Sequence, residues 1–187
     1  EMCIRDSLGL ENIEGGKAYE ASLRFITAMA FYKLYPEVKI RFSYNVSRAI
    51  FCQAVEGEVN MSRIADEVKA EVRRIIKENL PIERITVSLD EAREIYTRFG
   101  YADKMEMLKY RPENTVHLYK CGGFYDYLNA YMVPSTGCIK NYRITPYSPG
   151  LIIQYPRYEL GAQIPEFVEE STYGRTLQKI YRWSKKA

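Results

Sequence analysis

Cys121 is the side chain of this 187-residue sequence best suited to nucleophilic chemistry. A cysteine nucleophile needs a lowered pKa and a base within hydrogen-bond reach. The only histidine, His117, lies four residues earlier, which is about 13 Å along an extended strand. His117 therefore cannot be the base for Cys121 unless the chain bends sharply. A buried, unreactive cysteine and a plain strand histidine are the better interpretations.

A cluster of aromatic residues follows Cys121. It consists of Phe124, Tyr125, Tyr127 and Tyr131, and it stands between two glycines and Pro134. Rings on a glycine-opened loop can stack on a base or a nucleoside. The alternative is that they fill the interior of a core, which is the more frequent arrangement. Asp126, among them, either contacts a ribose hydroxyl or stabilises a turn.

The sequence lacks the residues for a phosphate-binding loop and for a structural zinc site. A phosphate-binding loop of the Gly-x-x-x-x-Gly-Lys-Ser/Thr type would have to include Gly16 and Lys17, but Glu11 replaces its first glycine and Ala18 its hydroxyl residue. The four cysteines are scattered and only one histidine is present, so a structural zinc site is not expected. The sequence predicts no catalytic residue, metal or cofactor in this chain.

Composition and charge favour a folded cytoplasmic protein. The net charge is +3, with 27 basic and 24 acidic residues interleaved along the chain, so charge alone does not indicate nucleic-acid binding. The scattered cysteines and the absence of a secretory signal favour the cytoplasm. No apolar run is long enough to cross a membrane.

The periodicity of apolar residues predicts the elements that position these side chains. A helix that Pro36 ends contains Leu23 and Leu34, and strands are expected at 38–46 and 49–55. The later expected elements are a helix capped by Ser62, a strand at 85–87, a helix with a Ser88–Glu91 capping box ended by Gly100, strands and turns from Thr115, and a last helix at 172–186. The sum is an α+β fold, with helices packed on one face of a mainly antiparallel sheet.

We divide the chain into four segments on this basis. Residues 1–8 resemble a translated sequencing-adaptor remnant and are excluded from the fold prediction. Residues 9–17 are expected to be a linker and residues 18–171 the folded domain. Residues 172–187 are expected to be a C-terminal helix that leads to a further domain.

Several segments, in order, resemble the second additional domain, the editing domain, shared by threonyl- and alanyl-tRNA synthetases. Leu34-Tyr35-Pro36 is similar to its Leu-Trp-Pro, and residues 87–94 are similar to its Val-Ser-x-x-Glu-Ala-Arg-Glu. Residues 177–181 are similar to Leu-Gln-Arg-Ile-Tyr, and Cys121 with Met132-Val133-Pro134 to the Cys-x-Gly…His-Val-Pro element. The resemblance covers most of residues 18–183 and implies the editing-domain fold.

A second resemblance is to the region that precedes the P-loop domain in bacterial nucleoside kinases of the uridine kinase type. It is carried by Tyr-x-x-Ser-Leu-x-Phe at 19–25, Cys-Gly-x-Phe-Tyr-Asp-Tyr at 121–127, Met-Val-Pro-Ser-Thr-Gly at 132–137 and Pro-Gly-x-x-x-x-Tyr-Pro at 149–156. These are the segments that depart from the synthetases. The resemblance implies an accessory domain whose kinase domain, with its ATP and Mg²⁺, follows Ala187.

The synthetase resemblance also implies where an editing site would lie. Its His-x-x-x-His pair falls on Ala21 and Phe25, its cysteine on Cys121 and its later histidine on Met132, so one polar group of four remains. Methyl, phenyl and thioether groups cannot exchange a proton. The candidate pocket comprises Ala21, Phe25, Cys121, Phe124, Tyr125, Asp126, Tyr127 and Met132.

The resulting hypothesis is a non-catalytic accessory domain of a nucleoside (uridine) kinase. Its expected partners are its own kinase domain and a nucleoside, a nucleotide or RNA. The alternatives are a tRNA-editing aminoacyl-tRNA deacylase domain and an RNA-binding module.

Overall fold

A computed structural model of the chain describes residues 13–46, 49–57 and 59–166. The elements follow one another as α1 (Ile13–Leu34), β1 (Lys39–Val46), β2 (Ala49–Glu56), α2 (Met61–Glu78), β3 (Glu83–Ser88), α3 (Leu89–Phe99), α4 (Ala102–Leu108), β4 (Thr115–Cys121), β5 (Phe124–Asp126), the 3₁₀ turn η1 (Thr136–Cys138), β6 (Arg143–Tyr147), β7 (Gly150–Gln154) and the 3₁₀ turn η2 (Tyr158–Leu160). The predicted C-terminal helix lies outside the described residues.

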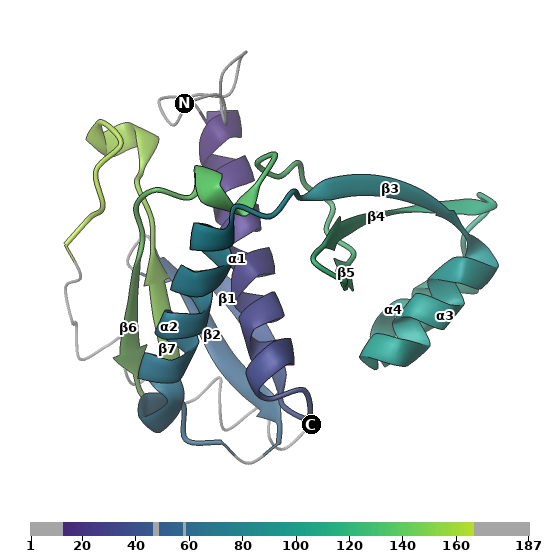
Figure 1. The fold of residues 1–187 in the computed structure, drawn as a ribbon, viewed down its shortest axis with the longest axis horizontal. Coiled ribbons are helices and arrows are strands. Elements are labelled where there is room, and N and C mark those ends of the chain that lie inside the picture. Colours follow the sequence, from purple (N-terminus) through teal and green to yellow (C-terminus); the bar gives the residue numbers. More distant parts are fainter. Residues whose placement is uncertain (1–12, 47–48, 58, 167–187) are drawn as a thin grey trace.

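The larger part of the molecule is a four-stranded antiparallel sheet covered by α1 and α2 (Figure 1). Its strand order is β1-β2-β7-β6, so the C-terminal hairpin pairs with the N-terminal one through β2 and β7. Fully buried side chains from both helices and from the sheet form the main core, including Leu23, Ile26, Val68, Ile75 and Ile153. We call this unit the large part.

The smaller part is a three-stranded antiparallel sheet of order β3-β4-β5, with α3 and α4 on one face (Figure 1). Val116 and Leu118 of β4 point to these helices and pack with Ala92, Tyr96 and Leu108. Alternate residues of a strand point to opposite faces. Tyr119 and Cys121 therefore point away from α3 and α4, and both belong to the main core of the large part.

The α+β class with antiparallel sheets and helices is confirmed. The strands form two sheets, and each sheet has its own pair of helices. Residues 13–17, expected to be part of a linker, are the first turns of α1. Helix α4 was not predicted, because it has only seven residues and no side-chain N-cap.

The helix ends follow the local chemistry of the sequence. Ser88 accepts a hydrogen bond from the Glu91 amide, which is one half of the predicted capping box, and Gly100 ends α3 with a positive φ of 71°, as predicted. The N-cap of α2 is Asn60 and not Ser62, since Asn60 Oδ1 accepts from the amides of Ser62 and Arg63. Among the described helices, none is long and apolar enough to span a bilayer.

Candidate functional site

A glycine turn places Cys121 opposite Phe124. Gly122 and Gly123 have φ values of 53° and 83° and connect β4 to β5, so Cys121 pairs with Phe124 in the ladder. Two consecutive residues of positive φ are the requirement of a type I′ hairpin, and glycine meets it without steric cost. The Gly-Gly pair of the sequence is therefore a structural turn.

Helix α1 provides the facing side of the candidate pocket. Ala21 and Phe25 are four residues apart, lie on one helix face and are buried. Between them, Ser22 Oγ accepts a 2.9 Å hydrogen bond from the Val133 amide and donates one of 2.7 Å to the Ala18 carbonyl. This contact fixes the segment next to Met132 against α1, and Met132 packs on the main core.

Phe124 fills the space between α1 and the small part. Its ring contacts Phe25 edge-on at a centroid distance of 5.2 Å, Phe99 of α3 at 5.5 Å and Tyr32 of α1 at 5.7 Å. Phe25 is completely buried, and Phe124 is 5% exposed. One of the two positions that the resemblance assigns to helix histidines, Phe25, therefore belongs to a group of packed rings, which we call the aromatic cluster (Phe25, Tyr32, Phe99 and Phe124).

Cys121 has the environment of an unreactive thiol. Its side chain is 1% exposed. Burial raises the pKa of the Cys121 thiol to about 11, and the negative charge of Glu83 adds to the rise. A nucleophilic cysteine requires the opposite shift. His117 hydrogen-bonds Thr86 through Nδ1 at 2.9 Å.

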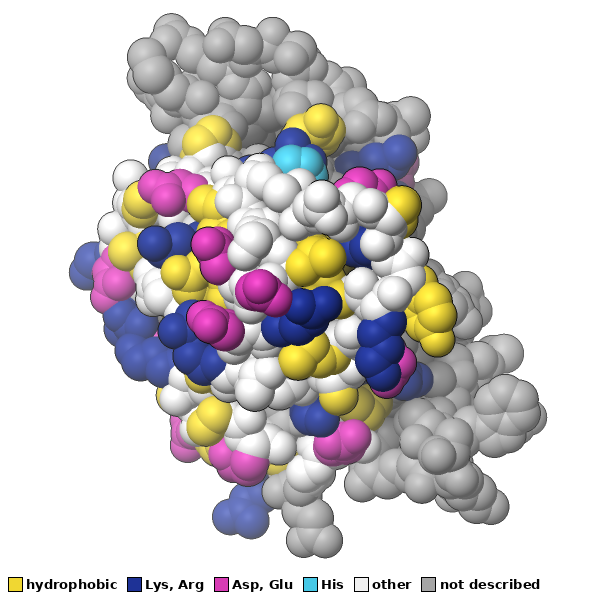
Figure 2. All heavy atoms as spheres, turned by 90° about the vertical axis from the view of Figure 1, so that its right-hand side faces the viewer, with side chains coloured by type: hydrophobic (Ala, Val, Ile, Leu, Met, Phe, Trp, Pro, Cys, Tyr) yellow, Lys and Arg dark blue, Asp and Glu magenta, His cyan; other side chains and the backbone are white. Residues whose placement is uncertain are grey.

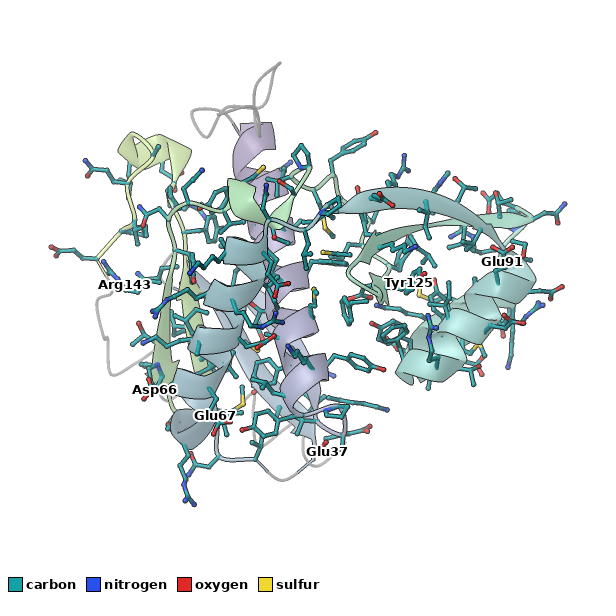
Figure 3. All side chains as sticks on the ribbon, viewed as in Figure 1. Glu37, Asp66, Glu67, Glu91, Tyr125 and Arg143 are labelled. Carbon is teal, nitrogen blue, oxygen red and sulfur yellow. The ribbon has the colours of Figure 1, made fainter. Side chains whose placement is uncertain are left out.

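Asp126 and Tyr125 are engaged in contacts within the small part. Asp126 forms an ion pair with Lys104 of α4 and accepts a 2.7 Å hydrogen bond from the Tyr127 amide. Burial raises the pKa of Asp126, and the Lys104 charge opposes that rise. The Tyr125 carbonyl accepts a 2.7 Å hydrogen bond from the Tyr101 hydroxyl, and the Tyr125 ring lies beside α3 (Figure 3). These contacts hold β5 and the residue after it against α4.

The segment Met132 to Gly137 connects the two parts. The Thr136 hydroxyl donates to the Ile75 carbonyl at 2.8 Å and accepts from the Leu80 amide at 2.9 Å. The Gly137 amide donates to Asn79 Oδ1 at 3.1 Å. These three hydrogen bonds are made to the end of α2 and the chain that leads into β3, so this motif holds the connection between α2 and the small sheet.

A cavity of about 490 Å³ lies on the face of the small sheet that is turned away from α3 and α4. Arg84 and Thr86 of β3 pair with Tyr119 and His117 of β4 and lie on this face. We call this cavity the basic pocket. Its lining residues are Lys17, Ala18, Arg84, Arg111, His117, Tyr119, Tyr127, Leu128, Asn129, Ala130 and Tyr131.

Of the eight residues of the predicted pocket, only Tyr127 lines the basic pocket, and Tyr131 of the predicted aromatic run lines it too. Phe25, Cys121, Phe124 and Met132 are packed into the main core or against it, and Ala21 is buried. The pocket residues come from α1, β3, the loop before β4, β4 itself and the loop after β5, so no single local motif marks the whole set. The described residues contain no group of three or more histidine, cysteine or acidic side chains able to hold a metal ion.

No protein-family model matches the chain. It is 30% identical to the threonine–tRNA ligase of Thermotoga neapolitana over 141 residues, 72% of this chain and 21% of the ligase. The enzyme of Carboxydothermus hydrogenoformans is 30% identical over 135 residues (72% and 21%), and that of Bacillus velezensis 31% over 132 residues (70% and 20%). The chain thus spans about a fifth of the length of these curated relatives. They support a threonyl-tRNA synthetase-like domain and do not test the resemblance to nucleoside kinases.

Proposed function

We propose that this chain is a non-hydrolytic domain of the synthetase editing type, which serves a longer protein as an accessory domain. The observation that carries the proposal is the contact of Phe25, which stands at one of the implied histidine positions, with Phe124; their ring centroids lie 5.2 Å apart. Hydrolysis of an aminoacyl ester needs a held water and a group that accepts its proton. An interior filled by two phenyl rings supplies neither.

The surroundings of the cluster support the same conclusion. Cys121 is the one polar group retained from the implied editing set, and burial keeps it as a thiol at neutral pH. Met132 offers only a thioether, which is a weak hydrogen-bond acceptor. The side chains that would orient a substrate have been replaced by side chains that pack.

The catalytic domain that we propose for the parent protein is an ATP- and Mg²⁺-dependent nucleoside kinase. The proposal rests on the segments at 121–127 and 132–137, which resemble the kinase-linked form of the domain. Sequencing the source DNA beyond codon 187 tests it. A Gly-x-x-x-x-Gly-Lys-Ser/Thr motif there would support the kinase, whereas a synthetase catalytic core would contradict it.

A deacylase acting on mischarged tRNA is the second candidate, because the similar proteins named above are threonine–tRNA ligases. It would need a base and a water site that do not use the implied histidine positions. The basic pocket is the described cavity in which such groups would have to lie.

A deacylation assay separates these functions. The purified chain is incubated with Ser-tRNA, and release of serine is followed beside a buffer blank and an editing domain that retains its histidines. We expect the rate of the blank, and no change in the Cys121→Ala variant. Release above the blank that is lost in Cys121→Ala would overturn the proposal in favour of the deacylase.

A further inference from the structure

Positively charged side chains gather at the basic pocket. The cations Lys17, Arg84 and Arg111 line it, and none of its lining residues is acidic. By contrast, acidic and basic side chains lie next to one another over the face shown in Figure 2. A local excess of cations on low-dielectric walls attracts an anionic ligand.

Arg111 lines the pocket and is held there by an acidic neighbour. Its Nε is 3.5 Å from Glu113 Oε2, and this buried Nε donates no hydrogen bond within the described part of the chain. Arg84 is exposed on β3. Guanidinium groups bind phosphate through paired N–H donors, which makes two arginines at one cavity suited to a phosphate.

Tyr131 provides an aromatic surface at the same cavity. Its ring is 70% exposed, and the Arg84 guanidinium lies 5.7 Å from the ring centroid. The buried Tyr119 hydroxyl donates a 2.6 Å hydrogen bond to the Ala130 carbonyl, so the loop that carries Tyr131 is fixed to β4. A pre-positioned exposed ring beside a guanidinium is the arrangement on which nucleic-acid bases stack.

The remaining polar groups suit a sugar and a base edge. Asn129 presents both a donor and an acceptor, and His117, bonded to Thr86, offers its second ring nitrogen. The volume of about 490 Å³ falls within the range of roughly 300–1,000 Å³ usual for small-molecule sites.

We propose that the basic pocket binds a nucleoside phosphate, with the base on Tyr131 and the phosphate on Arg84 and Arg111. The unit is either a free nucleotide or the 5′-phosphorylated end of an RNA chain. This inference goes beyond the proposed function, since a non-hydrolytic accessory domain need not bind any ligand. It also stands independently of the deacylation assay.

Isothermal titration calorimetry of the full chain with AMP, UMP, adenosine, inorganic phosphate and a short 5′-phosphorylated RNA tests the proposal at low salt. The variants are Arg84→Gln and Tyr131→Leu. Their matched controls are Arg143→Gln and Tyr110→Leu, whose parent side chains are exposed and do not line the pocket. Because all four positions are on the surface, circular dichroism is expected to be unchanged.

The expected result is binding of AMP or UMP that weakens about tenfold in each pocket variant and stays unchanged in each control. Binding of adenosine and of phosphate should be weaker than that of the nucleotide. Binding of the RNA alone, with the same dependence on both variants, would assign the ligand to an RNA end. The proposal is overturned if neither nucleotides nor RNA bind, if phosphate binds as tightly as AMP, or if the variants bind like their controls.

Discussion

Phe124 contacts aromatic rings from both parts of the molecule, so its removal tests what the aromatic cluster contributes. Phe124→Ala deletes contacts at 5.2 to 5.7 Å with Phe25, Phe99 and Tyr32 and leaves a cavity. We expect the free energy of unfolding to fall by about 3–5 kcal/mol, as for other buried phenylalanines. Urea denaturation measures it.

Tyr110→Ala is the control for this variant, because the Tyr110 side chain is 83% exposed. Its unfolding free energy should stay within about 0.5 kcal/mol of the parent. Equal values for the two variants would mean that Phe124 is not part of a packed core, and the argument against hydrolysis would fail with it.

The raised pKa of Cys121 also predicts a dependence of stability on pH. Its pKa is about 11 in the folded chain, against about 8.5 in an unfolded one. At a pH between these two pKa values, the folded chain keeps the thiol proton and the unfolded chain loses it. This group therefore leaves the free energy of unfolding unchanged below about pH 8.5 and lowers it as the pH rises further. The contribution lost by pH 11 is about 2–3 kcal/mol.

Unfolding of the parent and of Cys121→Ala, measured from pH 8 to pH 11, isolates this contribution. The other buried titrating groups are common to both chains. We therefore expect the stability of the parent to fall more steeply with pH than that of the variant. Parallel curves would show that Cys121 titrates normally in the folded chain, and would reopen the case for a reactive thiol.

At the scale of elements, mutation can distinguish the two candidate N-cap residues of α2, Asn60 and Ser62. Asn60 Oδ1 accepts from two helix amides at 3.1 and 3.3 Å, while Ser62 is exposed on the first turn. Asn60→Ala should lower stability by about 1 kcal/mol. Ser62→Ala should leave it within about 0.5 kcal/mol in the same thermal or urea unfolding experiment. The reverse order would favour the helix start predicted from the sequence.

The elements that the sequence predicts well are those whose signals are local. Ser88 and Gly100 mark the ends of α3 by side-chain capping and by positive φ, and both are read from single residues. Strands β1, β2 and β3 were predicted singly, whereas β4 to β7 were predicted only as strands and turns from Thr115. Which strands pair was not predicted, because a period-two pattern does not specify a partner. Helix α4 was not predicted, because seven residues are too few to show a helical period of apolar residues.

The sequence predicted only those parts of the candidate site whose residues are close together in the chain. The turn at Gly122 and Gly123 and the aromatic run after it stand together in the sequence. The basic pocket instead joins Arg84 to Tyr131 across 47 positions of sequence numbering. An exposed arginine and an exposed tyrosine are unremarkable separately, and only the ladder between β3 and β4 brings their neighbours together.

The molecule as a whole is held together by β4, whose two faces belong to different cores. Val116 and Leu118 pack under α3 and α4, while Tyr119 and Cys121 pack in the core of the large part. Figure 1 shows the two parts joined at the small sheet. If either part unfolds, β4 no longer packs against the other part, whose apolar surface becomes exposed. We therefore expect both parts to unfold in one cooperative transition.

The aromatic cluster lets the coupling between the parts be measured. Tyr32 of α1 and Phe99 of α3 are its closest pair, with centroids 4.7 Å apart. A double-mutant cycle of Tyr32→Ala and Phe99→Ala should give a coupling energy of about 0.5–1.5 kcal/mol, the usual worth of an aromatic pair beyond its burial. A control cycle of Tyr32→Ala with Tyr110→Ala should be additive within about 0.5 kcal/mol. Additivity in the first cycle would mean that α1 and α3 do not stabilise each other, and that Phe124 alone connects the rings of the two parts.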